Sequence, residues 1–530
     1  MSFTLYDTRQ RALVPLQPRE PGKVAIYNCG PTVYSESHIG NFRSFLFADL
    51  LRRSLEWSGY AVTQIMNITD VGHLTEDDRA DAAGEDKLQK KARELGWDPF
   101  RVARHFEERF HEDRRALGIA DAQAFPRATE HIREMLVQIQ QLLDRGHAYV
   151  PEGSGEVYYD IDTFPEYGKL SGKTLEDLRA GARVEVNLAK RHPADFALWK
   201  MDAAHLMQWD PHSEQLWQGF AGGRPQLDSR IGQGFPGWHI ECSAMSERYL
   251  GAEFDLHTGG EDNMFPHHEC EIAQARGATG CEFARHWMHA RHLLVNGAKM
   301  SKSAGTLYTL TDIVALGYRP VELRYLLLSN HYRQPMNFTL EGLAAARSSV
   351  QRLQNARTRL SQHARPGGPS TAASPAVAER ISVFERDFGA GLDDDLNIST
   401  ALAALFAFVG DCHRLAGNAE DAAHLLHALE RADHVLNVSQ TDAAKTGLIK
   451  KSELEQGDAG KLDPVQLDPA VLTALLEREL SPEVVHEIAR ARHQARRQKD
   501  WATADAIRTH LQRAGVQFED TPEGVRYKLP

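Results

Sequence analysis

Two lysines and two serine hydroxyls lie together in the run at residues 299–303, Lys-Met-Ser-Lys-Ser. Gly297 and Gly305 flank this run, which suits a mobile loop that closes over a polyphosphate. The ammonium groups of Lys299 and Lys302 would offset the negative charge that develops on a phosphoryl group and on its leaving pyrophosphate. A solvated basic loop is the alternative explanation for such a pentapeptide taken alone.

A second phosphate-binding candidate, His-Ile-Gly-Asn, occupies residues 38–41. A β-rich run at residues 24–27 precedes it, an apolar-periodic helix at residues 42–59 follows it, and a second β-rich run spans residues 61–68. This order of strand, loop, helix and strand predicts the βαβ unit of a nucleotide-binding sheet. In such folds the ligand lies beyond the carboxyl end of the strand, where the free N–H groups of the helix N-terminus attract phosphate.

Thiol, imidazole and carboxylate groups of the kind that bind zinc come from three separate segments. The candidate ligands are Cys29, Cys242, His267 and Glu271. His267 and Glu271 are four residues apart and therefore share one face of the predicted helix. His268 and Cys270 are rival ligands that spacing alone does not exclude. Taken singly, each cysteine also fits a small buried apolar residue, and the His–Glu pair fits a solvated i,i+4 pair.

The surrounding elements predict an α/β protein whose Rossmann-like parallel sheet is interrupted by an insertion. After the βαβ unit, helical patterns continue to about Gly146, and residues 147–237 then mix short strand signals with glycine, proline and tryptophan. This change of texture indicates an α+β insertion between the two halves of one sheet. Strand-like segments resume at residues 254–257 and 292–295, and the chain beyond Asp312 is helical.

The C-terminal part carries a basic helical face suited to nucleic acid. After a polar linker, a small module of helices and a final hairpin ends the chain. Within it, residues 488–499 contain five cations and no acidic residue, and Trp501 offers a ring that can stack on an unpaired base. The candidate contacts are Arg490, Arg492, Arg496, Arg497 and Trp501. A solvated basic helix with a core tryptophan is the alternative.

Length and composition describe an ordinary globular protein of several domains. At 530 residues the chain is long enough for about three to four cores. The sequence shows no apolar run long enough to span a bilayer, so the cytoplasm is the expected compartment and no membrane partner is expected. Five scattered cysteines argue against a disulfide framework. The net charge of −12 means that any nucleic-acid surface must be a local basic patch on an acidic protein.

A set of motifs, taken together and in order, resembles the cysteinyl-tRNA synthetases, a family of class I aminoacyl-tRNA synthetases. They are Cys-Gly-Pro-Thr-Val-Tyr (29–34), His-Ile-Gly-Asn (38–41), Asn-Ile-Thr-Asp (67–70), Gly-Trp-His-Ile-Glu-Cys-Ser-Ala-Met (237–245), His-Thr-Gly-Gly-Glu-Asp (257–262), Phe-Pro-His-His-Glu-x-Glu (265–271) and Lys-Met-Ser-Lys-Ser (299–303). The resemblance extends from the N-terminus to the final helix. It implies a monomeric ATP-dependent ligase that joins L-cysteine to tRNA(Cys) through a cysteinyl-adenylate.

The same resemblance implies roles for residues of this chain. One Zn²⁺ per chain would bind the substrate sulfur, Mg²⁺ would accompany ATP, and the zinc ligands would be Cys29, Cys242, His267 and Glu271. The groups acting on the phosphates would be His38, Asn41, Lys299 and Lys302. The ATP and adenylate contacts would be Gly30, Thr32, His38, Gly40, Asn41, Gly259, Gly260, Asp262 and Lys302. The cysteine contacts would be Cys29, Thr69, Trp238 and His257.

The resemblance also implies a division of the chain. The Rossmann catalytic domain would take residues 1–123 and 236–318, on either side of a connective insertion at residues 124–235. A stem-contact region with a helical bundle (319–445), a linker (446–468) and a small anticodon-binding module (469–530) would follow.

Two departures from the family pattern and two rival functions accompany this interpretation. The connector at residues 201–235 is longer than usual and has no assigned role, and Cys270 replaces a polar residue and leaves a spare thiol near the metal.

A related ligase that joins cysteine to an amino sugar shares the core and the zinc but lacks an anticodon module, so the C-terminal helices speak against it. A zinc-stabilised RNA-binding protein without catalysis would leave the lysine run at residues 299–303 without a purpose.

Overall fold

The computed structural model describes residues 3–76, 83–173, 189–221, 223–300, 306–440, 446–450, 482–513, 516–521 and 524–528. The chain folds into two compact units, residues 1–438 and residues 439–530. Lys302 and the side chain of Lys299 lie outside the described part, as does the start of the predicted C-terminal helices at residues 469–481.

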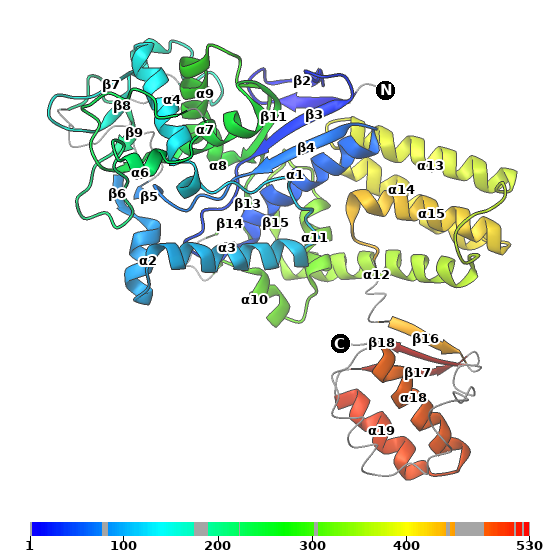
Figure 1. Ribbon diagram of the computed structural model, residues 1–530. Helices are drawn as coiled ribbons and strands as arrows, with labels where there is room; N and C mark the ends of the chain where they lie inside the picture. Colours follow the sequence, from blue (N-terminus) through cyan, green and yellow to red (C-terminus); the bar gives the residue numbers. More distant parts are fainter. Residues whose placement is uncertain are drawn as a thin grey trace. The chain divides into compact units, whose positions relative to one another are not determined.

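Unit 1 is built on a four-stranded parallel sheet with the strand order β12-β11-β3-β4. The strands are β3 (Lys23–Asn28), β4 (Ala61–Met66), β11 (Phe254–Gly260) and β12 (Ala284–Ala290). Asn28 at the end of β3 lies opposite Thr258 of β11, 230 residues later in the chain, and Figure 1 shows the blue β3 beside the green β11. The predicted Rossmann-like sheet is confirmed, and the carboxyl ends of its two central strands meet at one edge.

Helix α1 (Ile39–Trp57) connects β3 to β4 and packs on the sheet. His38 caps this helix, because its Nδ1 accepts hydrogen bonds from the N–H groups of Gly40 and Asn41 at 3.1 and 3.3 Å. In return, Oδ1 of Asn41 accepts from the N–H of His38 at 3.1 Å. The cap satisfies free N–H groups of the first helical turn. The His-Ile-Gly-Asn motif is therefore also the start signal of α1.

The insertion between β4 and β11 mixes helices and antiparallel strands. It contains α2 (Lys87–Leu95), α3 (Pro99–Ala116), α4 (Ile132–Asp144) and α6 (Glu214–Trp217), and a sheet of the order β10-β9-β8-β7. These strands are β7 (Ala148–Tyr149), β8 (Val157–Tyr159), β9 (Phe196–Lys200) and β10 (Phe235–Pro236). The insertion also contains the antiparallel pair of β5 (Leu74–Glu76) with β6 (Ala83–Asp86), and before the parallel sheet β1 (Thr4–Asp7) pairs antiparallel with β2 (Ala12–Pro15).

The second half of unit 1 returns to the parallel sheet and then becomes helical (Figure 1). Around β11 lie α7 (Trp238–Leu250), α8 (Glu261–Asn263), the π-helical turn η3 (Met264–His268) and α9 (Glu269–Thr279). A small sheet of the order β14-β13-β15 follows, with β13 (Leu293–Val295), β14 (Ala298–Lys299) and β15 (Met336–Phe338). The remaining helices are α10 (Leu310–Ala315), α11 (Pro320–Leu328), α12 (Leu340–His363), α13 (Pro375–Asp393), α14 (Ile398–Leu415) and α15 (Ala419–Leu436).

Contrary to the expectation from the sequence, one helix within the described residues, α14, has a length and composition that would suit a membrane span. It packs against α12, α13 and α15. Its residues Ala401, Leu405 and Phe408 are buried in this helical packing.

Unit 2 is a small module of helices α18 (Pro482–Arg497) and α19 (Trp501–Arg513) with a sheet of the order β16-β18-β17. The predicted final hairpin is confirmed as β17 (Gln517–Thr521) and β18 (Gly524–Lys528). The predicted linker is wrong at its start, because residues 446–450 form β16 and pair antiparallel with β18. A hydrophobic pattern of only five residues is too short to predict a strand, and the partner of this strand lies at the far end of the module.

Arg324 of α11 is a buried centre that ties several helices of unit 1 together. Its guanidinium donates to Asp49 of α1 at 2.6 Å and to the carbonyl oxygens of Leu436 and Leu117 at 2.6 and 3.1 Å. Burial alone would raise the pKa of the Asp49 carboxyl. The charges of Arg324 and Arg53 nevertheless hold this pKa below its usual value.

Replacing this cation is expected to destabilise unit 1. Arg324→Leu should lower its free energy of unfolding by about 3–5 kcal/mol, because the Asp49 carboxylate is left buried without its main partner. Urea denaturation followed by circular dichroism would measure the change. Arg359→Leu, at an exposed position of α12, is the matched control and should change stability by less than about 0.5 kcal/mol. Similar denaturation midpoints for the two variants would contradict the role given to Arg324.

Candidate active site and metal centre

A cavity of about 370 Å³ opens at the edge where the carboxyl ends of β3 and β11 meet. Segments far apart in the sequence line it, from residues 29–45, 67–73, 238–242, 260–267 and 290–300. This edge is where open α/β sheets bind their ligands. The two halves of the parallel sheet therefore contribute to one site.

The predicted zinc ligands converge at this cavity. The ligand atoms of Cys29, Cys242, His267 and Glu271 all lie within 4.8 Å of one another, and all four residues are buried. Nε2 of His267 lies 3.3 Å from Sγ of Cys242 and 3.0 Å from Oε1 of Glu271. Cys29 directly follows β3, and the others come from α7, η3 and α9. Two thiols, an imidazole and a carboxylate form a donor set that suits zinc.

Burial shifts the pKa of every member of this cluster away from its charged form. It raises the pKa of the Cys29 and Cys242 thiols and of the Glu271 carboxyl. It lowers the pKa of the His267 imidazole well below its usual value. A divalent cation would displace the protons of the thiols and the carboxyl and compensate the charge of the resulting anions. The chemistry of the cluster therefore fits a metal centre.

Of the two rival ligands, His268 lies beside the cluster and Cys270 lies apart from it. A second group, whose ligand atoms also lie within 4.8 Å of one another, consists of Cys29, His257, His268 and Glu271. Sγ of Cys29 is 3.2 Å from Nε2 of His268. Cys270 is in neither group, and its Sγ is 3.3 Å from the hydroxyl of Tyr167. The choice between the two groups stays a prediction.

His257, predicted as a cysteine contact, lies behind Glu271. Its Nε2 is 2.8 Å from Oε2 of Glu271, and its ring stacks on Trp287 with centroids 4.6 Å apart. Burial lowers the pKa of His257 to about 3, so its imidazole is neutral. Because Oε2 of Glu271 is hydrogen-bonded to His257, the other carboxylate oxygen, Oε1, faces His267. The structure thus places His257 next to a predicted metal ligand rather than among the residues that line the cavity.

Three stacked rings form the wall beside the metal cluster. Trp238 lies between His267 and His73, with centroid distances of 4.3 and 4.2 Å. The predicted cysteine contacts that line the cavity are Cys29, Thr69 and Trp238. His73 lines the cavity as well and was not predicted from the sequence. The signal available for it was its position three residues after the Asn-Ile-Thr-Asp motif.

Another part of the wall carries predicted ATP and adenylate contacts. Those that line the cavity are Gly30, Thr32, His38, Gly40, Asn41, Gly260 and Asp262. Gly259 lies behind them in β11, where an added Cβ would be 2.8 Å from Cε1 of His268. Met300 of the lysine run also lines the cavity, and a Cβ on Gly40 would overlap its Cε. The two phosphate motifs therefore approach each other here, while the placement of the Lys299 and Lys302 side chains stays a prediction.

Arg43 of α1 fixes the start of this helix to the sheet from which the lysine run departs. It is buried, and its guanidinium donates to the carbonyl oxygens of Arg291, Gln334 and His331 at 3.0, 2.7 and 3.2 Å. Burial lowers the pKa of Arg43 to about 10. Arg291 lies just before β13 and Gln334 just before β15. The buried cation thus holds the two sides of the predicted ATP site in register.

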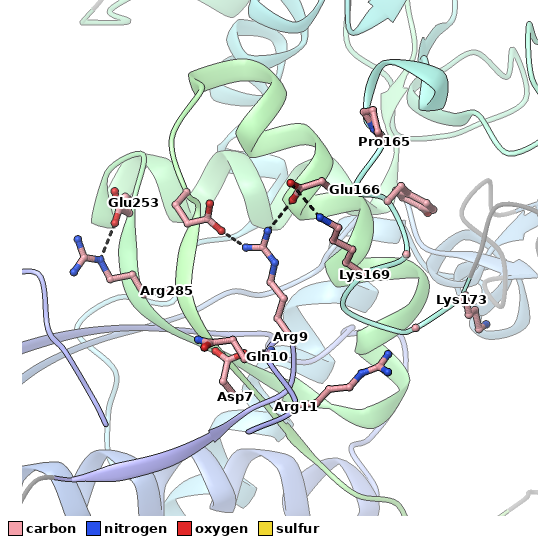
Figure 2. A pocket seen from close by; sticks show the side chains of 14 residues that line it. Asp7, Arg9, Gln10, Arg11, Pro165, Glu166, Lys169, Lys173, Glu253 and Arg285 are labelled. Carbon is pink, nitrogen blue, oxygen red and sulfur yellow. Dashed lines mark hydrogen bonds and ion pairs between the residues drawn. The ribbon is translucent and has the colours of Figure 1, made fainter. Parts of the chain in front are cut away.

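A second cavity lies between the β1–β2 turn and residues 165–173 (Figure 2). It is wide, with a volume of about 1260 Å³. Arg9 pairs with Glu166 at 3.0 Å, and Arg285 pairs with Glu253 at 2.7 Å. Because these cations and carboxylates neutralise one another, we assign this cavity to a surface ion-pair network and place the chemistry at the edge of the parallel sheet.

Unit 2 separates the predicted anticodon contacts into two groups. Arg492 is buried and donates to the two carboxylate oxygens of Asp520 at 2.8 and 2.9 Å. Arg496 donates to the same carboxylate at 2.8 Å. Arg496 is itself exposed, as are Arg490, Arg497 and Trp501, with 58% of Trp501 accessible. Arg492 therefore holds α18 against β17, and the exposed members present the surface that an RNA base or phosphate can reach.

Comparison with known proteins decides the family. Residues 15–215 and 210–348 match the family described as tRNA synthetases class I (C) catalytic domain, and residues 478–527 match the cysteinyl-tRNA ligase anticodon binding domain. A cysteine–tRNA ligase of Thermus thermophilus is 43% identical over 530 residues, which cover 100% of both chains. The chain belongs to the cysteinyl-tRNA synthetase family.

One further relative supports the cysteinyl-tRNA synthetase family, and one solved structure supports the fold. A cysteine–tRNA ligase of Deinococcus radiodurans is 42% identical and covers 99% of this chain and 97% of its own. A solved methionyl-tRNA synthetase of Mycobacterium tuberculosis, bound by methionyl-adenylate, matches with a TM-score of 0.50 and 16% identity over 79% of this chain and 90% of its own. At that identity the likeness shows the class I fold alone. The resemblance, the fold class and the enzyme class predicted from the sequence are confirmed.

Proposed function

We propose that the chain joins L-cysteine to tRNA(Cys) through a cysteinyl-adenylate, with ATP as the energy source. The observation that carries this proposal is the meeting of two kinds of site at one cavity. The buried cluster of Cys29, Cys242, His267 and Glu271 suits a thiol-binding metal, and residues 38–41 suit phosphate. A cavity that takes a thiol at one place and a polyphosphate at another suits activation of cysteine. The full-length likeness to cysteine–tRNA ligases supports the same reaction.

The reaction would proceed in two steps. The cysteine carboxylate attacks the α-phosphate of Mg·ATP, which forms the adenylate and releases pyrophosphate. His38 and Asn41 hold the phosphates at the N-terminus of α1, where the helix dipole favours anionic oxygen. Lys299 and Lys302 stabilise the charge that develops in the transition state. A terminal ribose hydroxyl of the tRNA then takes the cysteinyl group and releases AMP. Positioning and charge stabilisation can supply most of the catalysis without a protein nucleophile.

A metal in the cluster would account for the choice of cysteine over serine. The two amino acids differ by one atom, and a hydrophobic pocket rejects such an analogue only weakly. When bound, zinc supplies a thiophilic centre that takes the substrate sulfur as a thiolate, a form that a serine hydroxyl does not adopt at neutral pH. The protein contributes the ligands and the stack of Trp238 on His267, which keeps the imidazole in place.

Unit 2 would supply the contacts to the tRNA anticodon. Its exposed Arg490, Arg497 and Trp501 suit phosphate and base stacking, whereas Arg492 and Arg496 are engaged with Asp520. We also propose that the protein is a monomer that acts in the cytoplasm. The division of the chain into domains that the sequence predicts is part of the same proposal.

ATP–pyrophosphate exchange tests the proposed function directly. With the zinc-loaded full chain, we expect exchange that depends on cysteine, and exchange with serine below about 1% of that rate, because selection rests on the thiolate. The other amino acids serve as controls in the same assay. Exchange driven equally well by serine, or by an amino acid without a thiol, would contradict the proposal.

Lys302→Ala is expected to lower the rate of exchange by at least about 100-fold with little change in the KM for cysteine. The physical reason is that a lysine acting on transition-state charge contributes to the rate rather than to ground-state binding. Lys90→Ala, at an exposed position of α2, is the matched control and should keep the exchange rate. A Lys302→Ala enzyme with near-normal exchange would remove Lys302 from the mechanism.

A further inference from the structure

We propose that Lys87 and His73 are positioning residues that make the hydroxyl of Thr32 a hydrogen-bond donor to the carboxylate of the bound amino acid. This inference rests on the proposed function, since it adds a recognition contact to the same cavity. Thr32 touches the substrate in this assignment, and the other two residues act through it.

The three residues form a continuous chain of hydrogen bonds. Oγ1 of Thr32 lies 2.8 Å from Nδ1 of His73, and Nε2 of His73 lies 3.1 Å from Nζ of Lys87. Thr32 and His73 line the cavity. Lys87 is the first residue of α2, and its backbone N–H donates to the carbonyl oxygen of His73 at 2.9 Å. Two hydrogen bonds thus hold the lysine on the histidine.

Donor and acceptor chemistry fixes the direction of this chain. A lysine ammonium has donors and no acceptor, so Lys87 donates and Nε2 of His73 accepts. A neutral imidazole that accepts at Nε2 carries its proton on Nδ1, and His73 therefore donates to Oγ1 of Thr32. Because the Thr32 oxygen accepts this bond, its own proton is directed to a different acceptor. The hydroxyl becomes a donor of defined direction.

Packing holds the imidazole in the orientation that this chain requires. The ring of His73 stacks on Trp238 with a centroid distance of 4.2 Å and 12° between the planes. Only 8% of His73 is exposed. The stack fixes the plane of the ring, and the hydrogen bonds to Thr32 and Lys87 fix which edge faces each partner.

The position of Thr32 indicates which acceptor its hydroxyl meets. Thr32 lies in the loop that runs from Cys29 of the metal cluster to His38 of the phosphate motif. In the proposed reaction the substrate carboxylate must lie between the thiol, bound at the cluster, and the α-phosphate that it attacks. A donor on this loop suits a carboxylate oxygen, whereas the substrate ammonium offers only donors.

A double-mutant cycle tests this assignment in the zinc-loaded full chain. The KM values for cysteine and ATP are measured by pyrophosphate exchange for Thr32→Val, Lys87→Met and the combined variant. Thr32→Val should raise the KM for cysteine about tenfold or more and leave the KM for ATP unchanged. Lys87→Met should raise the KM for cysteine several-fold alone and not further in the Thr32→Val background. Thr32→Ser should restore the contact, and Lys90→Met on the exposed side of α2 is the matched control.

Cysteinol, which has the thiol and the amine but lacks the carboxylate, identifies the acceptor. Its inhibition constant against cysteine should be the same for Thr32→Val and the unaltered enzyme. Equal weakening of cysteinol and cysteine, a rise in the KM for ATP alone, or additive effects of Thr32→Val and Lys87→Met would each overturn the inference. Normal cysteine-dependent exchange in the unaltered enzyme would then leave the proposed function standing, whereas its absence would end both.

Discussion

Cys242→Ser is expected to remove zinc and cysteine activation together. Zinc should fall from about one ion per chain to below about 0.1, because a serine hydroxyl does not replace a thiolate in the group of Cys29, Cys242, His267 and Glu271. Cysteine-dependent pyrophosphate exchange should fall by more than about 100-fold, beyond the 10–100-fold effect of residues that only support a ligand. Metal analysis of the purified protein and the exchange assay measure the two quantities.

Cys270→Ser is the matched control, since Cys270 is buried on the same helix as Glu271 but belongs to neither described ligand group. This variant should keep its zinc and its activity within about twofold. His268→Gln distinguishes the second group, which contains His257 and His268 in place of Cys242 and His267. Full zinc in Cys242→Ser together with its loss in His268→Gln would move the metal to that second group.

A chain that ends at Val438 is expected to activate cysteine and to fail in charging tRNA. Val438 is the last residue of unit 1, which contains the cavity and the cluster. Exchange should stay within about twofold of the full chain, whereas the kcat/KM for aminoacylation of tRNA(Cys) should fall at least about 100-fold, equivalent to ~2.7 kcal/mol. Parallel exchange and aminoacylation assays separate the two activities.

Trp501→Ala in the full chain is the point-variant companion to this truncation. Trp501 is exposed, so its loss should weaken tRNA charging through the ~1–3 kcal/mol of a base–aromatic stack and leave unit 2 folded. Arg492→Ala should instead destabilise unit 2, because Arg492 is buried against Asp520. Efficient charging by the truncated chain would assign unit 2 another role.

The sequence by itself determined the features that neighbouring residues encode. The β-rich run before Cys29, the apolar period after Asn41 and the breaks at glycines were enough to predict the βαβ unit, since periodicity and capping are local properties of the chain. The ordered motifs were enough to predict the family, which the relatives confirm. The zinc set was also named from sequence, although its choice over His268 rested on resemblance.

Tertiary structure decided what depends on partners that are distant in sequence. Only the pairing of β3 with β11 brings Cys29 to the cluster. Burial against Asp520 turns Arg492 from a predicted RNA contact into a structural ion pair. The chain from Lys87 through His73 to Thr32 has no local signature either, because the direction of a hydrogen bond depends on which groups the fold places within reach. Local pattern fixes an element and its caps, but burial, charge compensation and hydrogen-bond direction exist only once separate segments pack together.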